Sequence, residues 1–188
     1  IWIITMIKRK LSCSIILTGL LLSSSVFAQQ CGDNQPSTAP NSRYQILNSG
    51  QEVKDLKTGL IWQRCLVGEQ WNGRACTGEI QKFSNADAHT YVAQHAKGWR
   101  VPSINELLTL HSGCWQLAIN TNAFPPNPAR YDKYDTLRSS TKFAPTPHEA
   151  KTLKDFKYDK MEWYWAFETA YGEKNYLSYD LPMRLIRR

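Results

Sequence analysis

The central part of the chain has the spacing of amphipathic helices, with apolar residues recurring every three or four positions. We predict a first helix that begins at the N-cap Ser84 and ends before Gly98, which can take the left-handed conformation that stops a helix. The residues predicted to form its inner face are Ala88, Tyr91, Val92 and His95. One side of this helix is therefore expected in the core.

A second helix is predicted from Ser103 to about His111. Ser103 and Glu106 have the spacing of a capping box, in which the hydroxyl and the carboxylate each satisfy a backbone amide near the start of the helix. Pro102 keeps the residue before it extended, so the connection between the two helices is expected to be short and rigid.

Trp99 and Arg100 are neighbours in this connection and have two interpretations. A guanidinium beside an indole ring can hold a sulfate or a carboxylate. We favour the structural interpretation, in which Trp99 fills the core and Arg100 binds a loop carbonyl or a buried acid.

Short segments of alternating polarity flank the helices and predict strands. The predicted strands are residues 43–47, 52–55, 60–64, 162–169, 175–179 and 183–187. Residues 116–148 are rich in proline and are expected to form an extended, loop-rich region. This order predicts a single α+β domain with small mixed or antiparallel sheets, two helices and long loops, whose two ends meet in one sheet.

The N-terminal residues have the pattern of a cleaved signal peptide. Residues 1–28, with Met6 as the expected start, contain a basic region, an apolar run and a small-residue site at Ala28. We expect a polar leader at 29–42 and the folded domain at 43–188. The protein is therefore expected to be exported to the periplasm, the cell surface or the medium, with no membrane span in the mature chain.

Four cysteines remain after the predicted cleavage, because Cys13 leaves with the signal peptide. An even number in an exported protein favours two disulfides, with three possible connectivities. The spacing favours Cys65–Cys76 and Cys31–Cys114. A zinc site is the alternative, but no Cys-x2-Cys pair or ordered histidine pair supports it.

The charge balance permits an acidic partner without requiring one. Without the basic residues of the signal peptide, the formal charge falls from +7 to +4, and we expect no nucleic-acid binding. The candidate contacts for an acidic glycan are the lysines Lys142, Lys151, Lys154, Lys157 and Lys160, with Tyr158 and Tyr164 as sugar-stacking rings. The alternative is an ordinary solvated segment, because acidic residues reduce the net charge of residues 148–160 to +1.

No pattern of catalytic residues stands out. The four histidines lie without a spaced nucleophile motif, and the acidic loop motif of calcium-dependent lectins is missing. We therefore expect no enzyme activity, no cofactor and no bound metal.

Several ordered motifs resemble those of one known family. They are Thr58-Gly59-Leu60-Ile61-Trp62-Gln63-Arg64-Cys65, Gly98-Trp99-Arg100-Val101-Pro102-Ser103-Ile104-Asn105-Glu106-Leu107, Ser139-Ser140-Thr141 and Met183-Arg184-Leu185-Ile186-Arg187. The chain resembles the Lcl C-terminal domain family, named for the terminal domain of a bacterial collagen-like adhesin. It differs from the family pattern at Leu137-Arg138, where an aromatic residue is usual, and in a longer lysine-bearing insertion at 142–161.

The resemblance implies a fold and a setting. It implies a C-type-lectin-like fold related to that of sulfatase-modifying enzymes, a surface or appendage location and, for the founding adhesin, binding to sulfated glycosaminoglycans. It marks as structural the motif residues Trp62, Trp99, Arg100, Pro102, Glu106 and Arg184.

We therefore expect an exported, non-catalytic module that recognises a surface glycan, possibly sulfated, or a surface partner in adhesion. One alternative is an accessory subunit of a surface appendage that has protein partners only. The other is an enzyme related to the sulfatase-modifying factors, which would need two free and close thiols.

Overall fold

The computed structural model describes residues 37–188, except 115–117, 130–134 and 159. The predicted signal peptide and most of the polar leader lie outside these residues. Among the helices that are described, none has the length and apolar character needed to cross a membrane.

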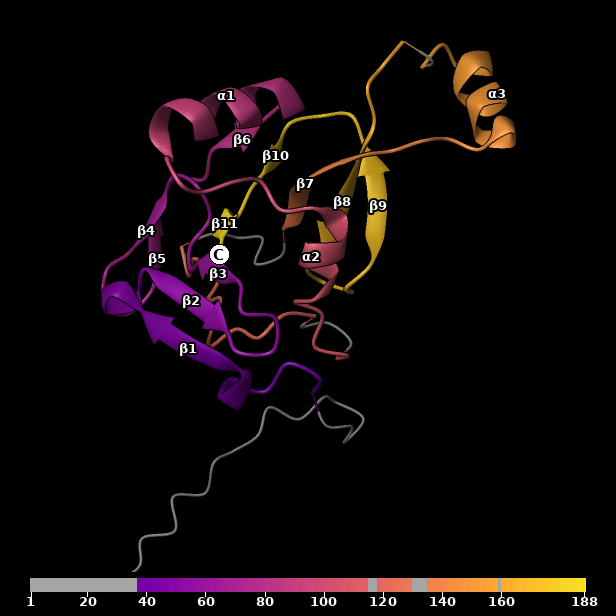
Figure 1. The fold of residues 1–188 in the computed structure, drawn as a ribbon. Coiled ribbons are helices and arrows are strands. Elements are labelled where there is room, and N and C mark those ends of the chain that lie inside the picture. The colour runs from indigo at the N-terminus through magenta and orange to yellow at the C-terminus, as the bar shows by residue number, and fades with distance from the viewer. Residues whose placement is uncertain (1–36, 115–117, 130–134, 159) are drawn as a thin grey trace, which may run out of the picture.

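The two ends of the described chain meet in one antiparallel sheet, as predicted (Figure 1). Its strand order is β1 (Tyr44–Leu47), β2 (Glu52–Asp55), β3 (Ile61–Gln63) and β11 (Ile186–Arg187). Trp62 on β3 is fully buried and pairs in register with Val53 on one side and Ile186 on the other. The central strand of this sheet therefore sits between the beginning and the end of the domain.

A second, three-stranded antiparallel sheet has the order β7 (Thr136–Lys142), β8 (Tyr164–Glu168) and β9 (Lys174–Leu177). Two smaller ladders join β4 (Glu69–Trp71) to β5 (Cys76–Gly78), and β6 (Lys82–Phe83) to β10 (Leu181–Pro182). Two 3₁₀ turns, η1 (Asn41–Arg43) and η2 (Asn48–Gly50), flank β1. The mixed helices and small antiparallel sheets confirm the α+β class.

Strand β7 lies within residues 116–148, which are predicted to form an extended, loop-rich region. Its sequence is polar, yet Leu137, Arg138 and Ser139 are buried. The Arg138 guanidinium donates to the backbone oxygens of Phe83 (2.8 Å) and Tyr179 (2.6 Å). Because these distant carbonyls satisfy a buried charged group, the strand can form without the apolar alternation that would predict it.

The first two helices begin where they were predicted. The Ser84 side chain caps α1 (Asn85–His95) by accepting from the Asp87 amide, and Ser103 and Glu106 form the capping box of α2 (Ile104–Leu108). Helix α2 is shorter than expected and ends before His111. His95, predicted to face inward, is exposed in the last turn of α1.

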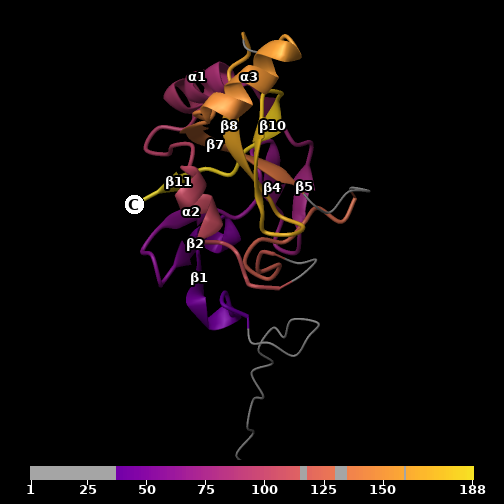
Figure 2. The same ribbon diagram turned by 90° about the vertical axis from the view of Figure 1, so that its right-hand side faces the viewer.

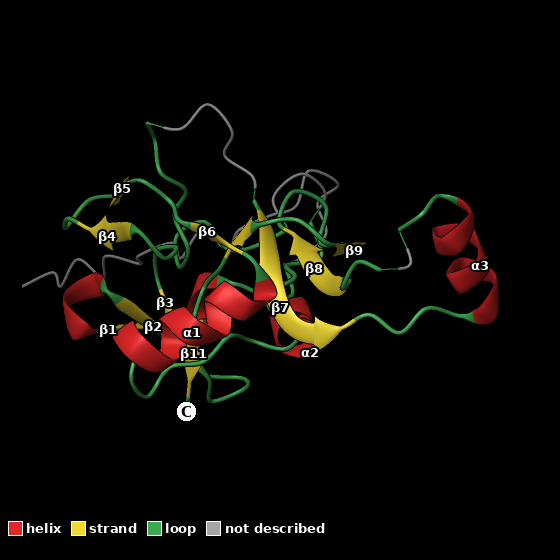
Figure 3. Cartoon of the chain, turned by 90° about the horizontal axis from the view of Figure 1, so that it is seen from above, coloured by secondary structure: helices red, strands yellow, loops and turns green. Residues whose placement is uncertain are grey.

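A third helix, α3 (Pro147–Asp155), was not predicted. Its start has a local signal, because Thr146 and Glu149 form a second capping box and Pro147 occupies the first turn. None of its residues is buried, and it stands away from the body at the end of a projecting segment (Figures 1 and 3).

Helix α2 lies between the two larger sheets (Figures 1 and 2). Leu107 of α2 belongs to one apolar cluster with Trp62 of the first sheet and Phe167 of the second. A smaller cluster, which includes Met183 and Leu185, packs beneath α1. The interior is thus continuous from one sheet to the other through α2.

A buried ion pair fixes the edge of the first sheet. Arg43 is bound through both Nε (2.8 Å) and a terminal nitrogen (2.5 Å) to the carboxylate of Asp55, which is fully buried. Burial by itself raises the pKa of Asp55, but hydrogen bonds from Arg43 and Thr58 outweigh it, and the pKa lies below its usual value. The pair therefore stays ionised inside the protein.

The motif pair Arg100 and Glu106 forms a bidentate ion pair, with N–O distances of 2.7 and 2.6 Å. This agrees with the interpretation that Arg100 binds an acid, although its side chain is 45% exposed. The hydrogen bonds from Arg100, and further ones from Ser103, lower the pKa of Glu106 to about 2 against the opposing effect of burial.

We predict that Glu106→Gln costs about 1–2 kcal/mol of unfolding free energy at neutral pH, a value reduced because the pair is partly exposed. The folded-state pKa lies below the unfolded value of 4.5. The stabilisation is therefore complete above that value and is lost as the pH falls toward 2. Urea unfolding of both proteins at several pH values measures this difference. A difference that stays constant as the pH falls from 5 to about 2 would contradict the assignment.

Candidate functional site

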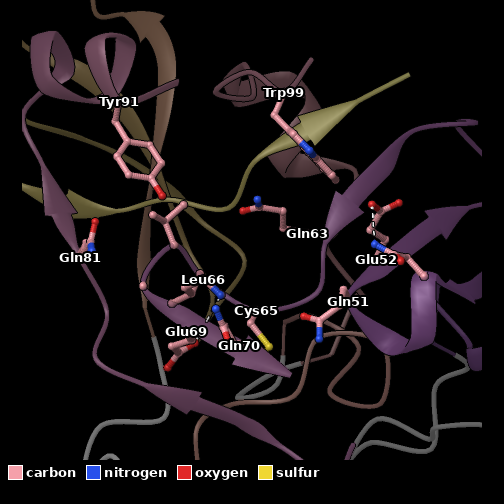
Figure 4. A pocket seen from close by; sticks show the side chains of 13 residues that line it. Gln51, Glu52, Gln63, Cys65, Leu66, Glu69, Gln70, Gln81, Tyr91 and Trp99 are labelled. Carbon is pink, nitrogen blue, oxygen red and sulfur yellow. Dashed lines mark hydrogen bonds between the residues drawn. The ribbon is translucent and has the colours of Figure 1, made fainter. Parts of the chain in front are cut away.

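A polar cleft of about 510 Å³ opens between the first sheet, the β4–β5 ladder and helix α1 (Figure 4). The side chains and backbone that line it come from widely separated segments. They are Asn48, Gln51, Glu52, Gln63, Cys65, Leu66, Val67, Gly68, Glu69, Gln70, Gln81, Tyr91 and Trp99.

The first sheet supplies one wall through η2, β2 and β3. Glu52 accepts a hydrogen bond from Arg187 at 2.7 Å and another from Asn48 at 3.2 Å. Gln51 is held by the backbone of Trp71, to which its side-chain amide donates at 2.9 Å. These side chains are therefore already fixed before any ligand arrives.

Two aromatic residues stand across the opening. Tyr91, on α1, packs against Phe83 with ring centroids 5.0 Å apart, and its hydroxyl points into the cleft (Figure 4). Trp99 lies beside the Arg187 guanidinium, which is 5.1 Å from its ring centroid. Both rings are half-buried, so the prediction that Trp99 is a core residue is only partly right: it packs on the smaller apolar cluster and also lines the cleft.

The floor of the cleft is tied by a disulfide. Cys65 and Cys76 are bonded, with their Cα atoms 5.6 Å apart, which confirms the predicted pairing. The bond joins the end of β3 to β5 and so holds the β4–β5 ladder against the first sheet. Cys114 is also disulfide-bonded. Its predicted partner, Cys31, lies outside the described residues, so that pairing stays a prediction.

Three side-chain amides in the cleft are available to a ligand. Gln63, Gln70 and Gln81 form no side-chain hydrogen bond with any other described residue, and Figure 4 shows them at different sides of the opening. Each carboxamide can donate two hydrogen bonds and accept two. Together they offer a set of neutral donors and acceptors around one space.

The ionisable acids that line the cleft are both glutamates. Glu52 and Glu69 are its two carboxylates, and the described lining residues include no lysine or arginine. Glu69 accepts a hydrogen bond from the Leu66 amide at 3.3 Å. Both carboxylates have a cation near them, because Glu52 is ion-paired with Arg187 and Glu69 interacts electrostatically with Arg184.

The lysines predicted to bind a glycan are elsewhere, along the projecting segment. Lys151 and Lys154 are exposed on α3, and Lys157 follows it. Lys142 ends β7 and forms an exposed ion pair with Glu162 at 2.8 Å. Their role in glycan binding stays a prediction.

A second, more apolar pocket of about 350 Å³ gathers three of the predicted contact residues, Lys142, Lys160 and Tyr158. Lys151, Lys154 and Lys157 do not line it. Tyr164 lies at a separate pocket of about 230 Å³ beside Arg138. The structure thus brings together only part of the predicted set.

The other motif residues have structural roles. Trp62 and Pro102 are buried, and Arg184 donates to the backbone oxygens of Gln63 (2.8 Å) and Arg64. Burial lowers the pKa of Arg184 to about 10, so it remains charged at neutral pH.

The amides of the cleft had no signal in the sequence. Gln63, Gln70 and Gln81 come from three different segments and form no motif along the chain. The sequence predicts Tyr91 as a core residue, because its helical spacing matches that of Ala88. Only the folded arrangement places these residues around one space.

A comparison with protein families gives one match. The sequence model of the Lcl C-terminal domain matches residues 51–187. No curated protein and no solved structure matches the chain. Within the described residues, no group of three or more His, Cys, Asp or Glu residues could hold a metal ion.

We predict that Cys65→Ala combined with Cys76→Ala lowers the unfolding free energy by about 3 kcal/mol, because the bond closes a short loop in the unfolded chain. Urea unfolding of the oxidised proteins measures the loss. The double variant is preferable to a reductant, which would also act on the bond of Cys114. A loss below about 1 kcal/mol would show that the ladder is held by its other contacts.

Proposed function

Because the chain belongs to the Lcl C-terminal domain family, we propose that it is an exported, non-catalytic module that binds a glycan in the amide-lined cleft. Membership of this family suggests a surface-associated domain. The finer statement, that the ligand is a glycan, is our own proposal and is supported by the chemistry of the cleft.

The single observation that carries the proposal is the combination of three available amides with two aromatic rings. Gln63, Gln70 and Gln81 can each donate to one sugar hydroxyl and accept from its neighbour. Tyr91 and Trp99 offer ring surface to the apolar C–H face of a sugar. A few fixed polar groups beside aromatic surface are typical of small-ligand sites of this size.

The lining of the cleft favours an uncharged glycan. A sulfate group would find no lysine or arginine among the described lining residues to replace its hydration. A sulfated glycan, as the family resemblance implies for the founding adhesin, would have to use the exposed lysines instead. The two ligand classes thus correspond to different surfaces of the same domain.

The enzyme alternative finds less support. A mechanism like that of the sulfatase-modifying factors needs two free thiols, whereas Cys65 and Cys76 are joined to each other. The disulfide also supports export, because such bonds persist in oxidising compartments. A purely structural role in an appendage would not explain why three side-chain amides of the cleft make no hydrogen bond with other described residues.

We predict that the exported protein binds one or more neutral oligosaccharides on a glycan array. The triple variant Gln63→Ala, Gln70→Ala, Gln81→Ala should weaken this binding at least about tenfold, because each amide contributes one or more hydrogen bonds. Isothermal titration with the best array ligand measures the affinity. Because the ligand is uncharged, the affinity should change little with salt concentration.

The matched control is Gln45→Ala, which removes an exposed amide of β1 outside the cleft and should leave the affinity unchanged. Trp99→Ala should also weaken binding, through loss of ring surface. Array binding confined to sulfated glycans, or a triple variant that binds like the unchanged protein, would exclude the cleft as the glycan site.

A further inference from the structure

The first sheet has one edge that the described residues leave open. Its last strand, β11, is covered on the outer side, because Ile186 exchanges backbone hydrogen bonds with Arg100. No described segment pairs with the outer side of β1, which Figure 1 shows at the lower margin of this sheet. The free amides and carbonyls of such an edge can pair with another strand.

The register of β1 on β2 decides which backbone groups of β1 face outward. The amide of Leu56 donates to the carbonyl of Arg43 at 2.9 Å, so the residue after Arg43, which is Tyr44, does not bond to the residue opposite it on β2. Bonded and non-bonded pairs alternate along an antiparallel ladder. Ile46, like Tyr44, therefore directs its amide and carbonyl away from β2.

Four backbone groups on this outer side make no hydrogen bond with another described residue. They are the carbonyl of Tyr44, the amide and carbonyl of Ile46, and the amide of Asn48. The Asn48 amide continues the series because the residue before it is still extended, with φ −124° and ψ 169°. The two other outward groups are used in local turns: the Tyr44 amide donates to Asn41, and the Asn48 carbonyl accepts from Gln51.

The four free groups are complementary to a second copy of the same strand in antiparallel orientation. With a two-fold axis at Ile46, the Ile46 amide of each copy donates to the Ile46 carbonyl of the other. Position 44 then lies opposite position 48, so the Asn48 amide of each copy donates to the Tyr44 carbonyl of the other. The Tyr44 amide and the Asn48 carbonyl also meet in this register, and neither needs a new partner.

The side chains of β1 do not oppose such pairing. Its sequence, Tyr44–Leu47, is uncharged and contains no proline, although lysine and proline are the residues that commonly protect an exposed edge. Strand β9, at the edge of the second sheet, has such protection in Lys174. The edge of β1 is thus open in both its backbone and its side chains.

Ile46 supplies an apolar contact at the centre of this edge. It is 44% exposed, although it pairs with the fully buried Val53 and shares its face of the sheet. It also lines a pocket of about 250 Å³ whose other lining residues are all uncharged. In the paired register, Ile46 of the second copy lies directly beside this side chain on the same face, where the pocket has room for it.

We propose that the protein forms a symmetric dimer in which β1 pairs with β1 of a second copy and the two first sheets become one continuous sheet. A second copy is the occupant because the free hydrogen-bonding groups of the edge match themselves. The proposal is independent of the glycan site, because β1 supplies no residue to the lining of the polar cleft.

The test is sedimentation equilibrium of the oxidised protein, its N-terminus determined by mass spectrometry, over a range of concentrations. We expect a monomer–dimer equilibrium with a dissociation constant below about 0.1 mM, as for a small interface. Ile46→Lys should raise this constant at least about tenfold, because two lysines would lie side by side across the axis. At a concentration where both proteins are monomeric, their melting temperatures should agree, since this side chain is exposed.

A charge exchange tests the register of the two strands. Ile46→Glu alone should be as monomeric as Ile46→Lys, whereas an equimolar mixture of the two variants should associate, because each glutamate then faces a lysine. The matched control is Tyr179→Lys, which adds the same charge at a side chain that is 58% exposed and away from β1. It should dimerise like the unchanged protein.

Three outcomes would overturn the proposal. The first is an unchanged protein that stays monomeric up to about 0.1 mM. The second is a dimer that Ile46→Lys and Tyr179→Lys weaken to the same extent, or that neither weakens, which would place the contact elsewhere. The third is a dimer that both Ile46 variants lose and their mixture does not restore, which would show that Ile46 does not face itself across the axis.

Discussion

The pairing of β11 with β3 is the contact on which the rest of the structure depends. It joins segments more than a hundred residues apart, and Arg184 reinforces it by donating to the backbone of Gln63, 121 positions away. Ile186, which faces Trp62 on this side, exchanges two backbone hydrogen bonds with Arg100 on its other side (2.9 and 3.0 Å). The last strand therefore connects the first sheet to the segment that links α1 and α2.

The same strand assembles the cleft. Arg187 reaches Glu52 on one wall and lies beside the Trp99 ring on the other. The cleft thus gains its shape only when both ends of the domain have folded together. The shape of a cleft built in this way is set by contacts between residues far apart in the sequence, such as the Arg187–Glu52 ion pair.

Local signals in the sequence were enough to predict the elements whose stability is local. The cap at Ser84 and the capping box at Ser103 gave the correct helix starts because side-chain and backbone partners lie within one turn. The helix α3 carries the same signal at Thr146 but was missed because the prolines around it favoured a loop. Strand β7 was missed for a different reason: its buried Arg138 is satisfied by carbonyls distant in sequence, and no local pattern reports such partners. The placement of the cleft amides and the half-exposed position of Trp99 could not be predicted for the same reason as β7, because they depend on residues that are distant in the sequence.

The adjacency of Phe143 and Trp163 has a consequence for how such domains diversify. Since the two ends of the segment 143–163 already meet, lengthening or shortening it adds a loop-closure entropy that grows slowly with loop length. Insertions at this junction should therefore lower the stability of the fold only slightly. The sequence of this segment can therefore change without altering the residues that line the cleft.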